Sequence, residues 1–194
     1  MNNLGKKYAD LKPLNEKSKE ILYEKARETI EDLKYTDYNK FSNLIKVIPE
    51  NLRLSYDSIE VNKQRTREGK EKGQHPIKPI YGQIYNAYLG ENLGSELSGE
   101  HPVVIVQNSK GNLFSQKVNV LPIEGDGNVI KEPYQKKLTS DDLEGDTKLT
   151  KDPSRIIISD IMTIDKKRLG IKIGKIKDEV MSDIYKRLIE QLKS

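Results

Sequence analysis

What the sequence lacks excludes several classes of protein. The 194-residue chain has no cysteine, which excludes disulfides, thiolate metal sites and a cysteine nucleophile. Its only histidines are His75 and His101, too few for a histidine-rich metal site. No run approaches the ~20 apolar residues of a membrane span, and no charged-then-apolar signal peptide opens the chain. We therefore expect a cytoplasmic protein with no metal, no other cofactor and no membrane partner.

Hydrophobic residues are also scarce. They make up 35% of the chain, and charged residues make up 33%. This composition supplies one modest core, because globular domains usually hold a larger apolar share. The length and the composition together predict one ordinary domain with an appendage.

The net charge of +4 is concentrated in one short segment. Residues 63–78 hold six basic and two acidic side chains, whereas acidic and basic residues balance on either side of this segment. The basic residues are Lys63, Arg65, Arg67, Lys70, Lys72 and Lys78. Two glycines and Pro76 within it, and Pro79 directly after it, favour a flexible linker. Such a linker either holds nucleic-acid phosphates through counterion release or is a solvated hinge without a partner.

Apolar residues recur at helical spacing before this segment. Residues 14–34 carry one apolar stripe and residues 37–48 carry another, which predicts two amphipathic helices. We expect Pro49 to end the second helix and residues 50–62 to form a third, short one. The predicted organisation is a helical extension over residues 1–62 and a basic linker over residues 63–79.

After Pro79 the sequence changes to short β-rich runs separated by Gly, Asn and Asp. The run Val103–Val106 predicts a strand buried on both faces. We expect a helical turn near residues 165–169, capped by Thr163, and a C-terminal helix over residues 178–192. The fold class predicted for residues 80–194 is therefore α+β, with a compact, strongly bent sheet or small β-barrel and a C-terminal helix. The predicted strands cover residues 80–89, 103–107, 117–123, 134–138, 155–164 and 171–176.

The C-terminal helix is expected to be amphipathic. The apolar side chains predicted to face the core are Val180, Met181, Ile184, Leu188 and Leu192.

Three places in this region carry residues suited to chemistry. The glycine-containing segment 90–102 either brings backbone amides close to a phosphate or is a long mobile loop, and it ends at His101. Glu124 lies at the tip of a predicted strand, where scaffolds place functional side chains, or is a solvated acid in a turn. Arg155 is either a phosphate clamp at a strand edge or a surface arginine.

These residues together match the needs of one reaction. Cleavage of RNA by its own 2′-hydroxyl requires a base for that proton and an acid for the leaving 5′-oxygen. Glu124 is our candidate base and His101 our candidate acid. Arg155 and loop amides are candidates for steadying the charge that builds on the phosphorus. This arrangement needs no metal.

The same residues lie in stretches that read YGQIYNAYLGENLGSELSGEHPVVIVQNSKGNLFSQKVNVLPI and DPSRIIISDIMTIDKKRLGIKIGKI, followed by a closing helix. Over residues ~80–192 the chain thereby resembles the MazF/PemK family of toxin–antitoxin ribonucleases. The resemblance implies an SH3-like or CcdB-like barrel, usually a homodimer. It also implies a metal-independent endoribonuclease that cleaves single-stranded RNA to a 2′,3′-cyclic phosphate and a 5′-hydroxyl, and an antitoxin protein that silences it.

The resemblance also assigns roles to particular residues. It identifies the Gly94–Gly99 loop as the loop that gates the RNA groove. The substrate-binding residues expected from it and from the chemistry above are Gly94, Ser95, Glu96, Ser98, Gly99 and Arg155. His101 stands where the family commonly has a catalytic arginine, and Glu124 stands where it commonly has a serine or threonine.

These departures leave two readings of the site. In the first, His101 and Glu124 form a rebuilt catalytic pair. In the second, the domain does not cleave and binds RNA, DNA or a protein partner. The apolar stripes of residues 1–62 likewise have three possible coverings, which are the barrel, a second copy of the chain or an antitoxin.

Overall fold

The computed structural model describes residues 12–33, 35–66 and 73–193. The chain divides into two compact units, Met1–Tyr56 and Asp57–Ser194. Part of the predicted basic linker, including Arg67, Lys70 and Lys72, lies outside the described residues. None of the described helices is long and apolar enough to cross a membrane.

The first unit contains helix α2 (Glu16–Asp32) and the start of helix α3 (Tyr38–Arg65). Asn15 caps α2, because its side chain accepts a hydrogen bond of 2.8 Å from the Ser18 amide. No residue of α2 is buried, so its predicted apolar stripe is exposed. The barrel, a second copy of the chain and an antitoxin all stay predictions for the partner that covers this stripe.

Helix α3 corrects the expectation that Pro49 ends a helix and that residues 50–62 form a separate one. It is a single helix of 28 residues that contains Pro49 in its interior. An interior proline costs a helix about 3 kcal/mol because it removes one hydrogen bond. The apolar repeat continues beyond the proline to Leu54 and Val61, both of which are buried, and this burial offsets the local cost.

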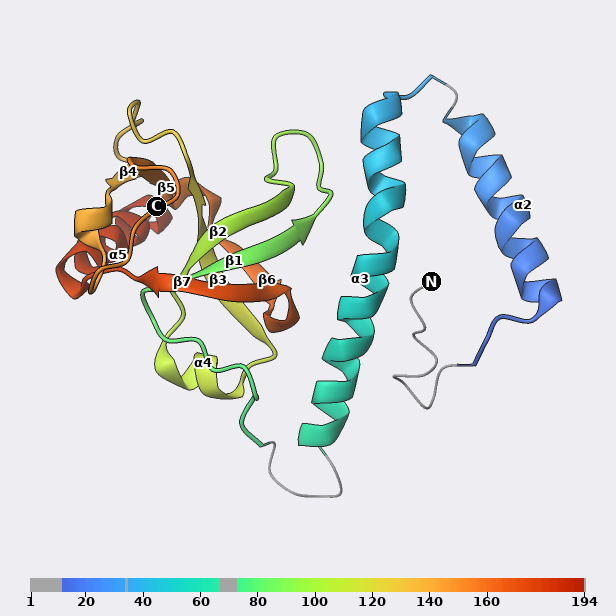
Figure 1. Ribbon diagram of the computed structural model, residues 1–194, viewed down its shortest axis with the longest axis horizontal. Coiled ribbons are helices and arrows are strands. Elements are labelled where there is room, and N and C mark those ends of the chain that lie inside the picture. Colours follow the sequence, from blue (N-terminus) through green and yellow to red (C-terminus); the bar gives the residue numbers. More distant parts are fainter. Residues whose placement is uncertain (1–11, 34, 67–72, 194) are drawn as a thin grey trace. The chain divides into compact units, whose positions relative to one another are not determined.

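Seven antiparallel strands build the second unit, and the predicted α+β fold with a bent β-sheet and a C-terminal helix is confirmed (Figure 1). They run in the order β4-β5-β3-β2-β1-β7, and β6 pairs with β3. The strands are β1 (Gln83–Gly90), β2 (Gly99–Ile105), β3 (Lys117–Glu124), β4 (Gln135–Leu138), β5 (Ser154–Ile157), β6 (Met162–Asp165) and β7 (Leu169–Lys175).

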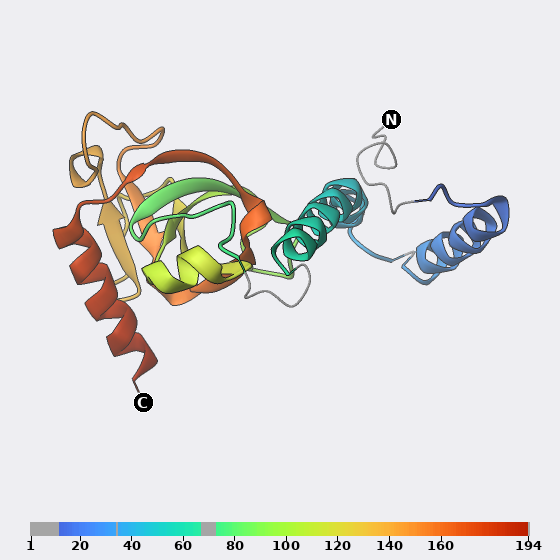
Figure 2. The same cartoon turned by 90° about the horizontal axis from the view of Figure 1, so that it is seen from below.

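Strand β3 bends the sheet, because two different strands share one of its edges. Its first half pairs with β6, Lys117 lying opposite Asp165, and its end pairs with β5, Glu124 lying opposite Arg155. The single strand predicted over residues 155–164 is therefore wrong. The chain leaves β5 through the 3-10 turn η2 (Ile158–Asp160) and re-enters the sheet as β6. Figure 2 shows the resulting curvature.

Short helical segments join the strands. Helix α4 (Ser109–Phe114), which the sequence did not predict, is capped by the Asn108 side chain, which accepts from the Gly111 amide at 2.9 Å. A 3-10 turn η1 (Ser140–Asp142) follows β4. The turn predicted near residues 165–169 is η3 (Lys166–Arg168), and its cap is Asp165 rather than Thr163. Asp165 Oδ1 accepts from the Lys167 amide at 2.8 Å, which a carboxylate one residue before the turn can reach.

Strand β2 passes between two parts of the core, as the continuous apolar run predicted. Val103, Val104 and Ile105 are fully buried, and alternate side chains face opposite sides. Val104 packs in the cluster that contains Met181 of helix α5 (Asp178–Leu192). Val103 and Ile105 belong to the second cluster, with side chains of β3 and β6.

The C-terminal helix α5 packs largely as predicted. Met181, Ile184 and Leu188 are buried, and Val180 packs against the same cluster. The expectation for Leu192 is wrong, because this residue ends the helix and is 62% exposed.

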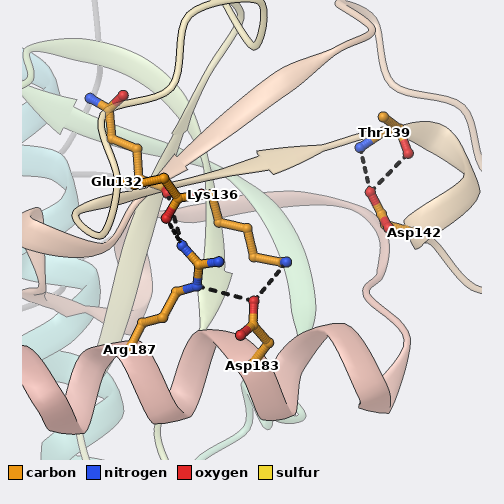
Figure 3. Close-up of polar contacts among 7 residues, drawn as sticks. Glu132, Lys136, Thr139, Asp142, Asp183 and Arg187 are labelled. Carbon is orange, nitrogen blue, oxygen red and sulfur yellow. Dashed lines mark hydrogen bonds and ion pairs between the residues drawn. The ribbon is translucent and has the colours of Figure 1, made fainter.

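Ion pairs hold α5 against β4 (Figure 3). Asp183 accepts hydrogen bonds from Lys136 Nζ at 2.7 Å and from Arg187 Nε at 3.1 Å, and Arg187 also pairs with Glu132. These partners, Lys136 first, lower the pKa of Asp183 from its usual value. The contacts hold β4, which pairs with β5, the strand that carries Arg155.

The last turns of α3 are docked onto residues 73–193 of the second unit, which hold the seven strands and α5 and are called the β-domain below. The Ser58 hydroxyl donates to Asp165 Oδ2 at 2.6 Å, and Gln116 Nε2 donates to Ser58 Oγ at 2.9 Å. Arg65 donates to the Gly73 carbonyl at 2.9 Å, to Gln116 Oε1 at 3.0 Å and to the Phe114 carbonyl. Residues 57–65 therefore contact the β-domain, while the domain boundaries drawn from the sequence stay a prediction.

Two buried basic side chains lie near this contact. Lys166 is fully buried and donates from Nζ to the Asn112 carbonyl at 2.6 Å. Burial, followed by the charge of Arg65, lowers the pKa of Lys166 to about 8. His75 is also fully buried, and burial with the nearby Lys166 lowers its pKa to about 4. This histidine is therefore neutral near pH 7.

Candidate active site

The candidate site lies where strands β2 and β3 separate. Their paired residues end at Val103 opposite Pro122. The next residue of β2, Pro102, has no N–H to donate to a continued ladder. Beyond it lies a groove of about 600 Å³ lined by the ends of both strands. Continued by two residues, the register sets His101 opposite Glu124.

The groove brings together three residues that the sequence selected separately, His101, Glu124 and Arg155. Its lining also includes the apolar side chains of Ile84, Ile123, Leu149 and Ile173. An apolar lining combined with a few converging polar groups is typical of ligand sites in proteins.

Glu124 and Arg155 form an ion pair across neighbouring strands. Arg155 donates from Nε at 3.0 Å and from Nη2 at 2.7 Å, both to Oε2 of Glu124. The Glu124 side chain is 29% exposed and the Arg155 side chain is 21% exposed. Among the described residues, Glu124 Oε1 accepts no hydrogen bond, so this oxygen is available to a substrate. The guanidinium also offsets a carboxylate charge that would otherwise repel a phosphate.

The ring of His101 is fixed by the preceding loop. His101 Nε2 lies 2.9 Å from the Ser98 carbonyl oxygen. A carbonyl oxygen only accepts hydrogen bonds, so Nε2 carries the proton of this contact. Proton exchange with a ligand therefore falls to Nδ1. The Ser98 hydroxyl accepts from the Asn92 amide at 2.9 Å, which ties the two ends of the loop together.

The loop predicted to bind substrate is folded on itself. Gly94 and Gly99 adopt φ values of 52° and 86°, which glycine allows without strain. The Leu93 amide donates to Glu96 Oε2 at 3.2 Å, and the Glu96 amide donates to the Leu93 carbonyl at 2.9 Å. Because these amides bond within the loop, they do not face a phosphate in this conformation.

The predicted site residues therefore fall into two groups. Ser95 and Glu96 line a separate cavity of about 550 Å³, together with residues of β6 and Arg168. They do not line the groove that contains His101. Ser98 is linked to this groove, because its carbonyl oxygen accepts the hydrogen bond from His101 Nε2. β2 begins at Gly99, so the loop is also shorter than the predicted segment 90–102.

Lys151 is a groove residue that sequence reasoning missed. It lines the groove beside Glu124 and Gly125 because segment 151–154 packs against segment 125–127. The only sequence signal for this packing is the glycine pair Gly125 and Gly127. A Cβ atom on Gly127 would lie 2.2 Å from the Ser154 carbonyl oxygen, so this close approach requires glycine.

In the described part of the chain, no group of three or more His, Cys, Asp or Glu side chains gathers to hold a metal ion.

Comparisons with known proteins give a consistent result. Residues 81–192 match the family described as PemK-like, MazF-like toxin of type II toxin-antitoxin system. The Endoribonuclease MazF of Staphylococcus saprophyticus is 38% identical over 103 residues, which are 53% of this chain and 82% of that protein.

Two solved structures are also similar to this chain. An endoribonuclease from Mycobacterial species is 20% identical, with a TM-score of 0.46, and the match covers 59% of this chain and 91% of that one. MazF from Deinococcus radiodurans is 14% identical, with a TM-score of 0.47, and the match covers 59% and 96%.

The matched region contains all seven strands and helix α5. It identifies the protein as a toxin of the type II toxin–antitoxin class. The chain belongs to the PemK/MazF family and is a homologue of an endoribonuclease.

Proposed function

We propose that the protein is a metal-independent endoribonuclease that cleaves single-stranded RNA. The 2′-hydroxyl gives its proton to Glu124, and its oxygen attacks the adjacent phosphorus. The bond from phosphorus to the 5′-oxygen breaks, and that oxygen takes the Nδ1 proton of a doubly protonated His101, whose Nε2 proton stays hydrogen-bonded to the Ser98 carbonyl. The products are a 2′,3′-cyclic phosphate and a 5′-hydroxyl, and proton exchange with water restores both side chains.

The observation that carries this proposal is the groove at the open end of the β2–β3 ladder, lined by His101, Glu124 and Arg155. Base, acid and cation come from three different strands. The two departures from the usual family residues are both titratable, and they lie on the two strand ends that separate at the groove. Because the side chains supply all three roles, the mechanism routes no step through a metal.

The proposal is tested by cleavage of a long mixed-sequence RNA in the presence of EDTA. We expect discrete cuts whose ends carry a 2′,3′-cyclic phosphate. Substituting His101→Ala or Glu124→Gln removes one proton-transfer group, and each change should slow cleavage by about 10²-fold or more. Glu179→Gln, at an exposed position on α5 outside the groove, is the matched control and should cleave normally. Full activity in both site variants would refute the assigned roles.

One observation favours a second candidate function, a module that binds nucleic acid or a protein without cutting. Arg155 is paired with Glu124, which leaves less of its charge for a phosphate. This alternative predicts a stable complex with RNA or DNA and intact RNA after hours at high protein concentration. Turnover of RNA at low protein concentration excludes it.

Family membership supports two further proposals about partners. We infer that the toxin acts in the cytoplasm as a homodimer and that a protein antitoxin silences it by covering the RNA groove. Light scattering on the purified chain tests the dimer. Co-expression with a candidate antitoxin, followed by the RNA cleavage assay, tests the silencing.

A further inference from the structure

Lys151 is the cation of the groove lining that no carboxylate already neutralises. Its side chain is exposed, and among the described residues its ammonium group has no hydrogen-bond or ion-pair partner. Arg155, the other cation of the lining, is paired with Glu124. Glu100 and Asp126 also line the groove and carry negative charge. Of the lysine and arginine side chains in the lining, Lys151 is therefore the one whose charge is available to an anion.

The stem of Lys151 lies directly across the backbone of Gly125. A Cβ atom on Gly125 would lie 2.0 Å from Lys151 Cδ and 3.1 Å from its Cβ and Cε. Gly125 does not adopt the left-handed backbone conformation that requires glycine. The residue after Glu124 is therefore kept small by the lysine stem and not by its own backbone.

The backbone that carries Lys151 is also held in place. The Ser154 hydroxyl donates to the Lys151 carbonyl at 2.6 Å, and the Gly127 amide donates to the Pro153 carbonyl at 3.1 Å. Ser154 itself is buried. The lysine thus starts from a packed turn and crosses the glycine beside Glu124.

We propose that Lys151 is a substrate-binding residue whose ammonium contacts a phosphate of single-stranded RNA in the groove, and that Gly125 is its positioning residue. This inference rests on the proposed function, because it takes RNA as the ligand. The contact is made to the RNA backbone, so it does not depend on base sequence.

The first test measures binding of a fully 2′-O-methylated RNA oligonucleotide, which lacks the attacking hydroxyl, by fluorescence anisotropy over a range of salt concentrations. Removing the contact with Lys151→Met should weaken binding about fivefold, the scale of an exposed charge contact. It should also reduce the slope of log affinity against log salt by about 0.7. Lys148→Met, an exposed neighbour outside the groove, makes the same charge change and should bind like wild type. Equal affinities for the two variants would overturn the proposal.

The second test separates positioning from charge with a double-mutant cycle. Gly125→Ala should displace the flexible lysine stem with little loss of thermal stability, and it should weaken binding in the same direction as Lys151→Met. In the Lys151→Met background, Gly125→Ala should have no further effect on binding, because no ammonium group remains to be moved away from the phosphate. An undiminished effect in that background would show that Gly125 acts without Lys151.

The two proposals fail in different ways. Lys151-dependent binding of the methylated RNA without cleavage of ordinary RNA would overturn the endoribonuclease and support the lysine contact. Normal cleavage and normal binding by Lys151→Met would overturn only the lysine contact.

Discussion

At the scale of single residues, register brings the candidate site together. Glu124 and Arg155 are direct cross-strand neighbours, and such pairs share one face of a sheet. His101 reaches the same groove because the β2–β3 ladder ends beside Pro102. Each of these residues stood out in the sequence as a polar side chain next to an apolar strand. Lys151 did not, because its place depends on how two loops pack, which no local pattern records.

A buried histidine gives a prediction about pH. The pKa of His75 is lowered to about 4 in the folded protein, and it is near 6.5 in the unfolded chain. Between these values the unfolded state binds more protons, so the free energy of unfolding falls as the pH drops from 6.5 towards 4. We expect a loss of about 2 kcal/mol between pH 7 and pH 5 from this group, measured by urea unfolding.

Substitution identifies the source of that pH dependence. In His75→Asn the side-chain oxygen can accept the hydrogen bond from the Ile77 amide that Nδ1 now accepts at 3.0 Å. This variant should lose most of the slope, whereas His101→Ala should keep it. A slope that survives in His75→Asn would assign the effect to other groups.

At the scale of elements, the sequence predicted the approximate positions of most strands and the amphipathic α5. It failed where tertiary contacts override local rules. Helix α3 continues past Pro49 because its later turns bury Leu54 and Val61. The apolar run after Arg155 reads as one strand, yet β3 offers it two separate pairing positions, so the chain bends at η2. The bend at η2 has no signal within its own segment, and the helical repeat beyond Pro49 does not record that it continues the helix before the proline.

The docked end of α3 predicts where the chain tolerates truncation. Removing residues 1–56 keeps the hydrogen bonds of Ser58 and Arg65, so the melting temperature of the β-domain should stay within a few degrees of the full chain. Removing residues 1–75 deletes Arg65 and His75 and takes away the partners of Gln116 and Asp165. This shorter chain should melt well below the other one in calorimetry.

A single substitution tests the same contact in the full chain. Arg65→Ala leaves the Phe114 and Gly73 carbonyls and the Gln116 side chain without their donor, which should cost about 2–3 kcal/mol of unfolding free energy. Among the described residues, the exposed Arg27 pairs only with Glu24 on its own helix, so Arg27→Ala should change stability by less than about 0.5 kcal/mol. Equal stability of the two variants would mean that the α3 contact contributes little.

At the scale of the whole molecule, charge separates into a nearly neutral protein and one basic segment. The +4 excess lies entirely within residues 63–78. The groove lining adds no net positive charge of its own, because its carboxylates offset Lys151 and Arg155. Long-range attraction of RNA to this protein is therefore expected from the segment, in addition to the local phosphate contact proposed for Lys151. Of the two sequence readings of this segment, the phosphate-holding one makes a measurable prediction.

Replacing Arg67, Lys70 and Lys72 together by Gln lowers the net charge from +4 to +1 without altering the groove. If these three side chains contact phosphates, RNA affinity at low salt falls, and the slope of log affinity against log salt drops by about 2. The cleavage rate at saturating RNA should not change, because the acid and base remain in place. A variant that binds with unchanged affinity and unchanged slope would identify the segment as a solvated hinge. RNA binding would then depend on the groove, and Lys151→Met should weaken RNA affinity more than the triple Gln replacement does.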